Sequence, residues 1–128
     1  MRIILADPNQ KSLWALKTLL DEEPGMEVVG DAEHARQLQT IAETCSADLV
    51  LLDKKLPGAE IGALITDLHI LVPRPVVVVM SSDTEDGRFM LKAGADAFLS
   101  KGERPDWLLT VLRQYAQRMQ NSDVTGSE

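Results

Sequence analysis

Short apolar runs recur along the chain, separated by longer segments in which apolar residues return every three or four positions. This alternation is typical of parallel strands joined by helices. Three runs, at 3–5, 49–52 and 76–79, are apolar without polar alternation, which indicates central strands covered by helices on both faces. The runs predicted to be strands are Arg2–Ala6, Glu27–Asp31, Asp48–Leu52, Val76–Met80 and Ala97–Leu99.

Three of the intervening segments carry an apolar stripe at helical spacing, which predicts amphipathic helices packed on the sheet. The third stripe is the most regular, and Pro73 ends it because proline cannot continue a helix. The stripe residues are Leu13, Leu16 and Leu20 in the first segment, Leu38, Ile41 and Cys45 in the second, and Ile61, Leu64, Ile65, Leu68 and Val72 in the third.

A shorter fourth helix is predicted between Thr84, as its N-terminal cap, and Ala93, with Gly94 as its stop signal. Gly87 inside this segment lowers the expected rigidity of the helix. A last helix is predicted over Asp106–Met119, where apolar residues again share one face.

The length of 128 residues and the hydrophobic content of 45% suffice for one continuous core and leave no room for a second large domain. We expect a single domain over residues 1–120. Residues 121–128 are small and polar, and they are predicted to form a flexible tail or the start of a linker.

The formal net charge of -7 should repel nucleic acid and anionic lipid, so no direct contact with either is expected. The single cysteine, Cys45, cannot form an internal disulfide, and the chain opens without a charged and apolar leader. The longest apolar run, Val76–Met80, is too short to span a bilayer. These features predict a cytoplasmic protein that does not enter a membrane.

Four polar residues lie just after predicted strands: Asp7, Asp53, Ser81 and Lys101. Taken singly, each is an ordinary turn or loop residue. In an open α/β sheet, however, ligands bind beyond the carboxyl ends of the strands, so these side chains are expected at one edge. Two carboxylates, a hydroxyl and an ammonium group there could together hold a divalent cation and a phosphoryl group.

This joint pattern resembles the receiver domain of bacterial two-component response regulators from Arg2 to about Met119. The segment before Lys101 is most similar to receivers that precede helix-turn-helix output domains, which implies a place in transcription regulation. The implied fold is flavodoxin-like: a doubly wound parallel sheet of five strands in the order 2-1-3-4-5, with helices on both faces. The matching stretches are IILAD at 3–7, LLDKKLPG at 51–58, VVMSS at 78–82 and AGADAFLSK at 93–101.

The resemblance implies that Asp53 accepts a phosphoryl group from a histidine kinase and forms an acyl phosphate. Mg²⁺ and the ammonium group of Lys101 would neutralise the oxygens of the transferring group. Ser81 would hydrogen-bond the phosphoryl group, and Phe98, the switch aromatic, would turn inward in response. The surface made by the fourth helix, the fifth strand and the last helix would then change.

The chain departs from the family at Pro8, where receivers usually carry a second acid after the first strand. Proline offers neither a side-chain oxygen nor an amide hydrogen. The remaining protein ligands for Mg²⁺ would be Asp7, Asp53 and the backbone carbonyl of Lys55, with water completing the shell. Weakened Mg²⁺ binding is therefore expected. The Lys55 side chain either partly offsets the lost charge near the phosphoryl group or is simply solvated.

Two alternatives to a phosphorylated switch remain. Pro8 fits a degenerate receiver that acts as a phosphorylation-independent interaction module. A flavodoxin-like enzyme or nucleotide-binding domain would need a glycine-rich phosphate loop after the first strand, and residues 7–10 do not provide one. We therefore expect no enzyme. The candidate partners are a histidine kinase, a downstream output domain or protein, and a second copy of the chain in a homodimer.

Trp14 and Trp107 fall off the apolar stripes of the first and last helices. We interpret both as partly buried residues. The alternative is a contact patch, because these two helices should cover the same face of the sheet and exposed aromatic residues mark interfaces.

Overall fold

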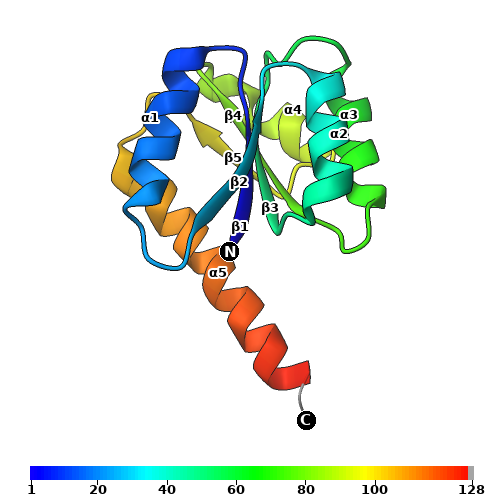
Figure 1. Cartoon of the computed structure of the whole chain (residues 1–128). Coiled ribbons are helices and arrows are strands. Elements are labelled where there is room, and N and C mark those ends of the chain that lie inside the picture. Colours follow the sequence, from blue (N-terminus) through cyan, green and yellow to red (C-terminus); the bar gives the residue numbers. More distant parts are fainter. Residues whose placement is uncertain (127–128) are drawn as a thin grey trace.

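One parallel sheet forms the middle of the molecule (Figure 1). The computed structural model describes the backbone of residues 1–126 and the side chains of residues 1–121. Within that range the sheet has five strands in the order β2-β1-β3-β4-β5, and every pair of neighbours is parallel, which confirms the predicted fold class. The strands are β1 (Arg2–Ala6), β2 (Glu27–Ala32), β3 (Leu49–Asp53), β4 (Val76–Ser81) and β5 (Ala97–Ser100).

Helices cover both faces of this sheet and divide the core into two layers (Figure 1). α1 and α5 pack on one face, where their leucines meet those of β1 and β3. α2, α3 and α4 pack on the other face. In Figure 1 the C-terminal part of α5 extends beyond the sheet. The helices are α1 (Gln10–Asp21), α2 (Ala35–Cys45), α3 (Ile61–Ile70), α4 (Gly87–Lys92) and α5 (Pro105–Gly126).

The third apolar stripe was predicted to reach Val72, two residues beyond the end of the helix. α3 ends at Ile70, Leu71 is already extended, and Val72 is 95% exposed. The cause is Pro73, because a proline keeps the residue before it out of the helical region and the helix stops ahead of that residue. Val72 therefore does not belong to the buried face of α3.

The prediction for the fourth helix was wrong at its start. Thr84 is not a cap: Asp83 caps a 3-10 turn that precedes the helix, since its carboxylate accepts a hydrogen bond from the amide of Glu85 at 2.9 Å. This turn is η1 (Thr84–Asp86), and α4 begins only at Gly87. Asp83 is the better capping residue because its charged carboxylate accepts hydrogen bonds from unpaired backbone amides more strongly than the hydroxyl of Thr84 would.

The last helix is longer at both ends than the predicted segment 106–119. It begins at Pro105 and continues to Gly126, so residues 121–126 of the predicted tail are helical. Residues 127 and 128 lie outside the described part of the chain. The division into a domain over residues 1–120 and a following linker stays a prediction.

Gly30 in β2 lies directly against the side chain of Ile41 in α2. A Cβ atom there would stand 2.6 Å from Cγ2 of Ile41 in α2. We expect Gly30→Ala to lower the free energy of unfolding by about 1–3 kcal/mol, because the Ile41 side chain or the helix that carries it must shift. Urea denaturation measures this. Gly102→Ala is the control, since its Cβ would meet only Ser100 Oγ at 3.7 Å; equal losses in both variants would contradict the steric argument.

Candidate functional site

Two buried carboxylates and one lysine meet at the carboxyl edge of the sheet. Asp7 directly follows β1, Asp53 is the last residue of β3, and Lys101 directly follows β5. Only 3% of Asp7 and 7% of Asp53 is exposed. The Lys101 Nζ donates to Oδ2 of Asp7 at 2.6 Å and also to Oδ2 of Asp53. Residues nearly a hundred positions apart therefore form one charged cluster, as the strand ends predicted.

The backbone fixes the orientation of both carboxylates. Oδ1 of Asp7 accepts a hydrogen bond from the amide of Asn9 at 2.8 Å, and Oδ1 of Asp53 accepts one from the amide of Lys55 at 2.7 Å. Asn9 in turn caps α1 through its own side chain. Because one oxygen of each acid is held by the backbone, the other oxygen is directed at Lys101.

The charge of Lys101 is stabilised by its two partners. Burial alone would lower its pKa, but the hydrogen bonds from its ammonium group to Asp53 and Asp7, together with their negative charge, raise the pKa above the ordinary lysine value. The ammonium group therefore stays charged at neutral pH. A permanent positive charge beside Asp53 is suited to a reaction that brings further negative charge to this carboxylate.

Ser81 ends β4 at the same edge, but its hydroxyl is turned to another partner. Ser81 Oγ donates to Oδ2 of Asp86 at 2.7 Å and accepts from the amide of Asp83 at 3.1 Å. Lys54 Nζ lies 2.8 Å from the other oxygen of Asp86. A surface hollow of about 440 Å³ opens here, lined by the loops after β3 and β4.

Lys54 and Asp86 did not emerge from the sequence reasoning. Hydrogen bonds from Lys54 and then Ser81 hold the pKa of the Asp86 carboxyl below its ordinary value. The available signal was the position of Asp86 one turn beyond the strand-end serine, in a segment assigned wholly to a helix. Lys54 directly follows Asp53 and is half-buried, whereas the side chain of Lys55, the lysine singled out from the sequence, is exposed.

The oxygen ligands at this edge are few. Pro8 is exposed beside Asp7, and no cluster of three or more histidine, cysteine, aspartate or glutamate residues suited to a metal occurs within the described side chains. Asp7 and Asp53 are the two acids present, and the Lys55 carbonyl belongs to the same loop as the amide that Asp53 binds. The donor set fits Mg²⁺, an oxygen-seeking ion that keeps several waters, with one acid fewer than expected.

Phe98 lies in β5 next to the start of α4. It is half-buried and packs against the core layer under α2, α3 and α4. Its ring occupies the space beside Gly87, where a Cβ atom would stand 3.0 Å from the ring carbon Cδ1. The absence of a side chain at Gly87 therefore gives the ring its place.

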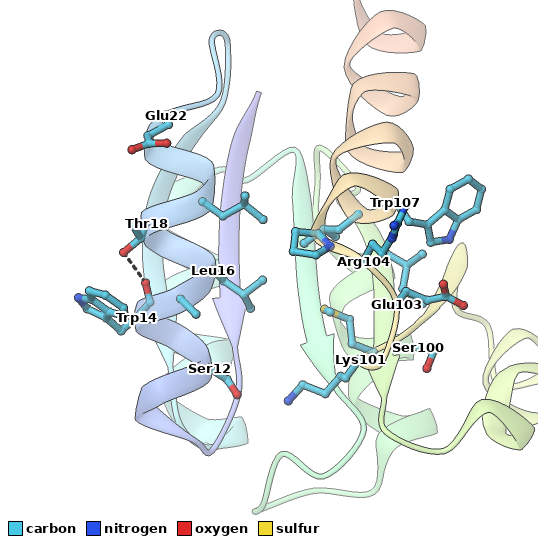
Figure 2. A pocket seen from close by; sticks show the side chains of 16 residues that line it. Ser12, Trp14, Leu16, Thr18, Glu22, Ser100, Lys101, Glu103, Arg104 and Trp107 are labelled. Carbon is cyan, nitrogen blue, oxygen red and sulfur yellow. Dashed lines mark hydrogen bonds between the residues drawn. The ribbon is translucent and has the colours of Figure 1, made fainter.

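The two tryptophans are more exposed than predicted. Trp14 is 70% and Trp107 49% exposed, so the interpretation as partly buried residues was wrong. Both line a cavity of about 520 Å³ between α1 and α5, whose wall also includes Lys101. Figure 2 shows the two indole rings on opposite sides of this cavity, pointing away from each other. The apolar stripes indicate which helix faces are buried, but they do not reveal that a cavity remains between α1 and α5.

The strand order and the carboxylate and lysine cluster at the carboxyl edge define a flavodoxin-like α/β domain of the receiver type. The model of the response regulator receiver domain matches residues 3–113, and the chain belongs to this family of two-component signalling domains. Receiver domains bind Mg²⁺ at their phosphorylation site, are phosphorylated by histidine kinases and pair with output domains. Within residues 1–126, every helix is too short or too polar to span a membrane.

Curated relatives include regulators of transcription. The nitrate/nitrite response regulator protein NarL of Escherichia coli K12 is 35% identical over 116 residues, covering 89% of this chain and 54% of that protein. The transcriptional regulatory protein DegU of Brevibacillus brevis is 28% identical over 119 residues, covering 91% and 50%. The chain thus spans about half the length of these relatives.

A solved receiver domain from Methanospirillum hungatei has the same fold, with a TM-score of 0.78, 29% identity, and coverage of 94% of this chain and 97% of that one. Receiver domains in general are not enzymes, although some enzymes carry one. The protein-glutamate methylesterase/protein-glutamine glutaminase of Alkalilimnicola ehrlichii is 30% identical over 105 residues, which cover 79% of this chain and 27% of that protein.

Proposed function

We propose that this chain is a phosphorylation-controlled switch whose phosphoryl acceptor is Asp53. The observation that carries the proposal is the contact of Lys101 Nζ with both Asp7 and Asp53. The other carboxylate oxygen of Asp53 is held by the backbone amide of Lys55. Asp53 ends the central strand β3, between the strands that carry Asp7 and Ser81. It is therefore the acid closest in the sheet to all the other groups of the site.

In the proposed reaction, a carboxylate oxygen of Asp53 attacks the phosphorus of a phosphohistidine on a kinase. A P–O bond forms, the P–N bond breaks, and the imidazole nitrogen leaves with the electron pair. Lys101 already carries its positive charge and needs little rearrangement to face the phosphoryl oxygens. Ser81 donates its hydroxyl hydrogen to one of these oxygens once the group is in place.

Asp7, Asp53 and the Lys55 carbonyl would hold Mg²⁺ at this site. When bound, the ion supplies positive charge that neutralises the transferring group. With Pro8 in place of an acid, we expect a lower affinity than a site with three carboxylates would have. Lys101 contacts both acids, which lowers their net negative charge and favours the same outcome.

The output surface is proposed to be the one made by α4, β5 and α5. Phe89 and Leu91 on α4 are exposed by 71% and 52%, which suits a surface that binds another domain or protein. The partners we propose are a histidine kinase, a downstream output domain or protein, and a second copy of the chain. We propose no catalytic activity of the domain itself, no direct nucleic-acid contact and a cytoplasmic location.

Intact-mass spectrometry after incubation with acetyl phosphate and Mg²⁺ tests this function. The expected result is the gain of one phosphoryl group. The second candidate, an unphosphorylated interaction module, is favoured by Pro8 and predicts no gain at any Mg²⁺ concentration.

Replacing Pro8 by the missing acid should strengthen the metal site. We expect Pro8→Asp to lower the Mg²⁺ dissociation constant about tenfold, because it adds a hard oxygen ligand beside Asp7. Pro8 is exposed, so the new side chain displaces no core residue. The hydrogen bond from the Asn9 amide to Asp7 Oδ1 does not involve Pro8 and can persist. Calorimetric titration measures it, and Pro8→Asn is the uncharged control. An unchanged constant in Pro8→Asp would mean that the two native acids and water already satisfy the ion.

A further inference from the structure

Asp86 ties together the two loops that flank the acceptor. It is the last residue of η1, and only 13% of its side chain is exposed. One carboxylate oxygen accepts the hydroxyl hydrogen of Ser81 at 2.7 Å, and the other lies 2.8 Å from Lys54 Nζ. Ser81 belongs to the end of β4 and Lys54 to the loop after β3, so a single carboxylate bridges both segments.

This arrangement conflicts with the role of Ser81 in a phosphorylated state. A serine hydroxyl has one hydrogen to donate. In the structure Ser81 donates it to Asp86, whereas a phosphoryl group on Asp53 would need the same hydrogen. The two acceptors therefore compete.

The residue after Asp86 connects the same turn to Phe98. Gly87 begins α4, and the Phe98 ring fills the space in which a Gly87 side chain would stand. The short turn η1 thus carries Asp86, whose carboxylate binds the Ser81 hydroxyl. It leads directly into Gly87, whose backbone lies against the Phe98 ring. A movement of this turn reaches both switch residues.

We propose that Asp86 is a latch: a positioning residue that holds Ser81 and Lys54 before phosphorylation and must release Ser81 for the switch to operate. The inference rests on the proposed phosphorylation of Asp53. Part of the energy of binding a phosphoryl group is spent on opening the latch. Release of Asp86 then frees η1 and the start of α4, and the wall beside Phe98 can move.

The test uses beryllofluoride, a phosphoryl mimic, at a fixed excess of Mg²⁺, with binding followed by the amide NMR signals of Ser82 and Gly87. We expect Asp86→Ala to lower the apparent dissociation constant about tenfold, because no charged acceptor competes for Ser81. Asp86→Asn keeps the size of the side chain, removes its charge and should give a smaller gain. Glu85→Gln, an exposed acid in the same turn, is the matched charge control and should change the constant less than twofold.

A double-mutant cycle separates the latch from a structural role. In a Ser81→Ala background, Asp86→Ala should no longer improve binding, because there is no hydroxyl to release. If wild type binds beryllofluoride and neither Asp86 variant binds it more tightly, the latch is overturned and the proposed function stands. If neither wild type nor the Asp86 variants bind it, the phosphorylated switch itself fails, and the latch with it. Binding only after Asp86 is replaced would support the latch but count against phosphorylation of the native chain.

Discussion

An Asp53→Asn variant is expected to gain no phosphoryl group from acetyl phosphate under conditions in which the wild-type chain gains one. An amide is a poor nucleophile, and the substitution keeps the shape of the side chain. Its oxygen can still accept the hydrogen bond from the amide of Lys55, so the loop after β3 should hold its position. Intact mass over a time course measures the loss.

Asp7→Asn is the matched control for this prediction. It removes the same charge from the same cluster, since Lys101 contacts both acids. If Asp53 is the acceptor, Asp7→Asn should slow the reaction by weakening the metal site, yet still reach the added mass of one phosphoryl group. Labelling that persists in Asp53→Asn and disappears in Asp7→Asn would make Asp7 the acceptor instead.

Lys101→Met should lower the rate of phosphorylation by about 10²–10³-fold, the typical cost of removing one preorganised charge from the site of developing negative charge. The methionine keeps much of the length and the apolar body of the lysine but leaves Asp7 and Asp53 without their common cation. Initial rates at saturating Mg²⁺ measure the effect. Lys92→Met on the exposed face of α4 is the control and should react like wild type.

The same variant yields a pH dependence with a defined sign. The pKa of Lys101 is higher in the folded chain than for a free lysine, so its contribution to stability is fully present below about pH 10.4. That contribution is lost as the pH rises through the folded value. Wild type should therefore lose its advantage over Lys101→Met only in strongly alkaline solution, as urea denaturation at several pH values measures. An advantage that disappears at neutral pH would mean that Lys101 is not held charged by the two acids.

Much of the site was predictable because parallel strands bring their carboxyl ends to one edge. Asp7, Asp53 and Lys101 needed only the correct placing of three strand ends, and apolar runs without alternation mark such strands well. The position of Ser81 followed in the same way. Its hydrogen-bond partner did not, because the direction of a hydroxyl depends on which acceptor the neighbouring loop brings near.

The failures share a physical cause. Asp86 reaches Ser81 only because a 3-10 turn interrupts the segment before α4, and apolar periodicity does not report such a turn. The burial of the two tryptophans was mispredicted for a related reason. An apolar stripe identifies the buried face of a helix, whereas the exposure of residues beside that face depends on the spacing between α1 and α5. The sequence patterns thus predicted which helix faces are buried and which residues share a sheet edge, but not the turns and open spaces between the elements.

The division of the helices into two layers has a consequence for how the domain can evolve. α1 and α5 share one core, α2, α3 and α4 share the other, and the sheet separates them. Substitutions deep in one layer should therefore combine additively with substitutions in the other. Epistasis should concentrate at the strand ends, where Lys101 borders the α1 and α5 cavity and also contacts Asp53. Substitutions in one layer can thus adapt its helices to a new binding partner while the helices of the opposite layer keep binding their existing partner.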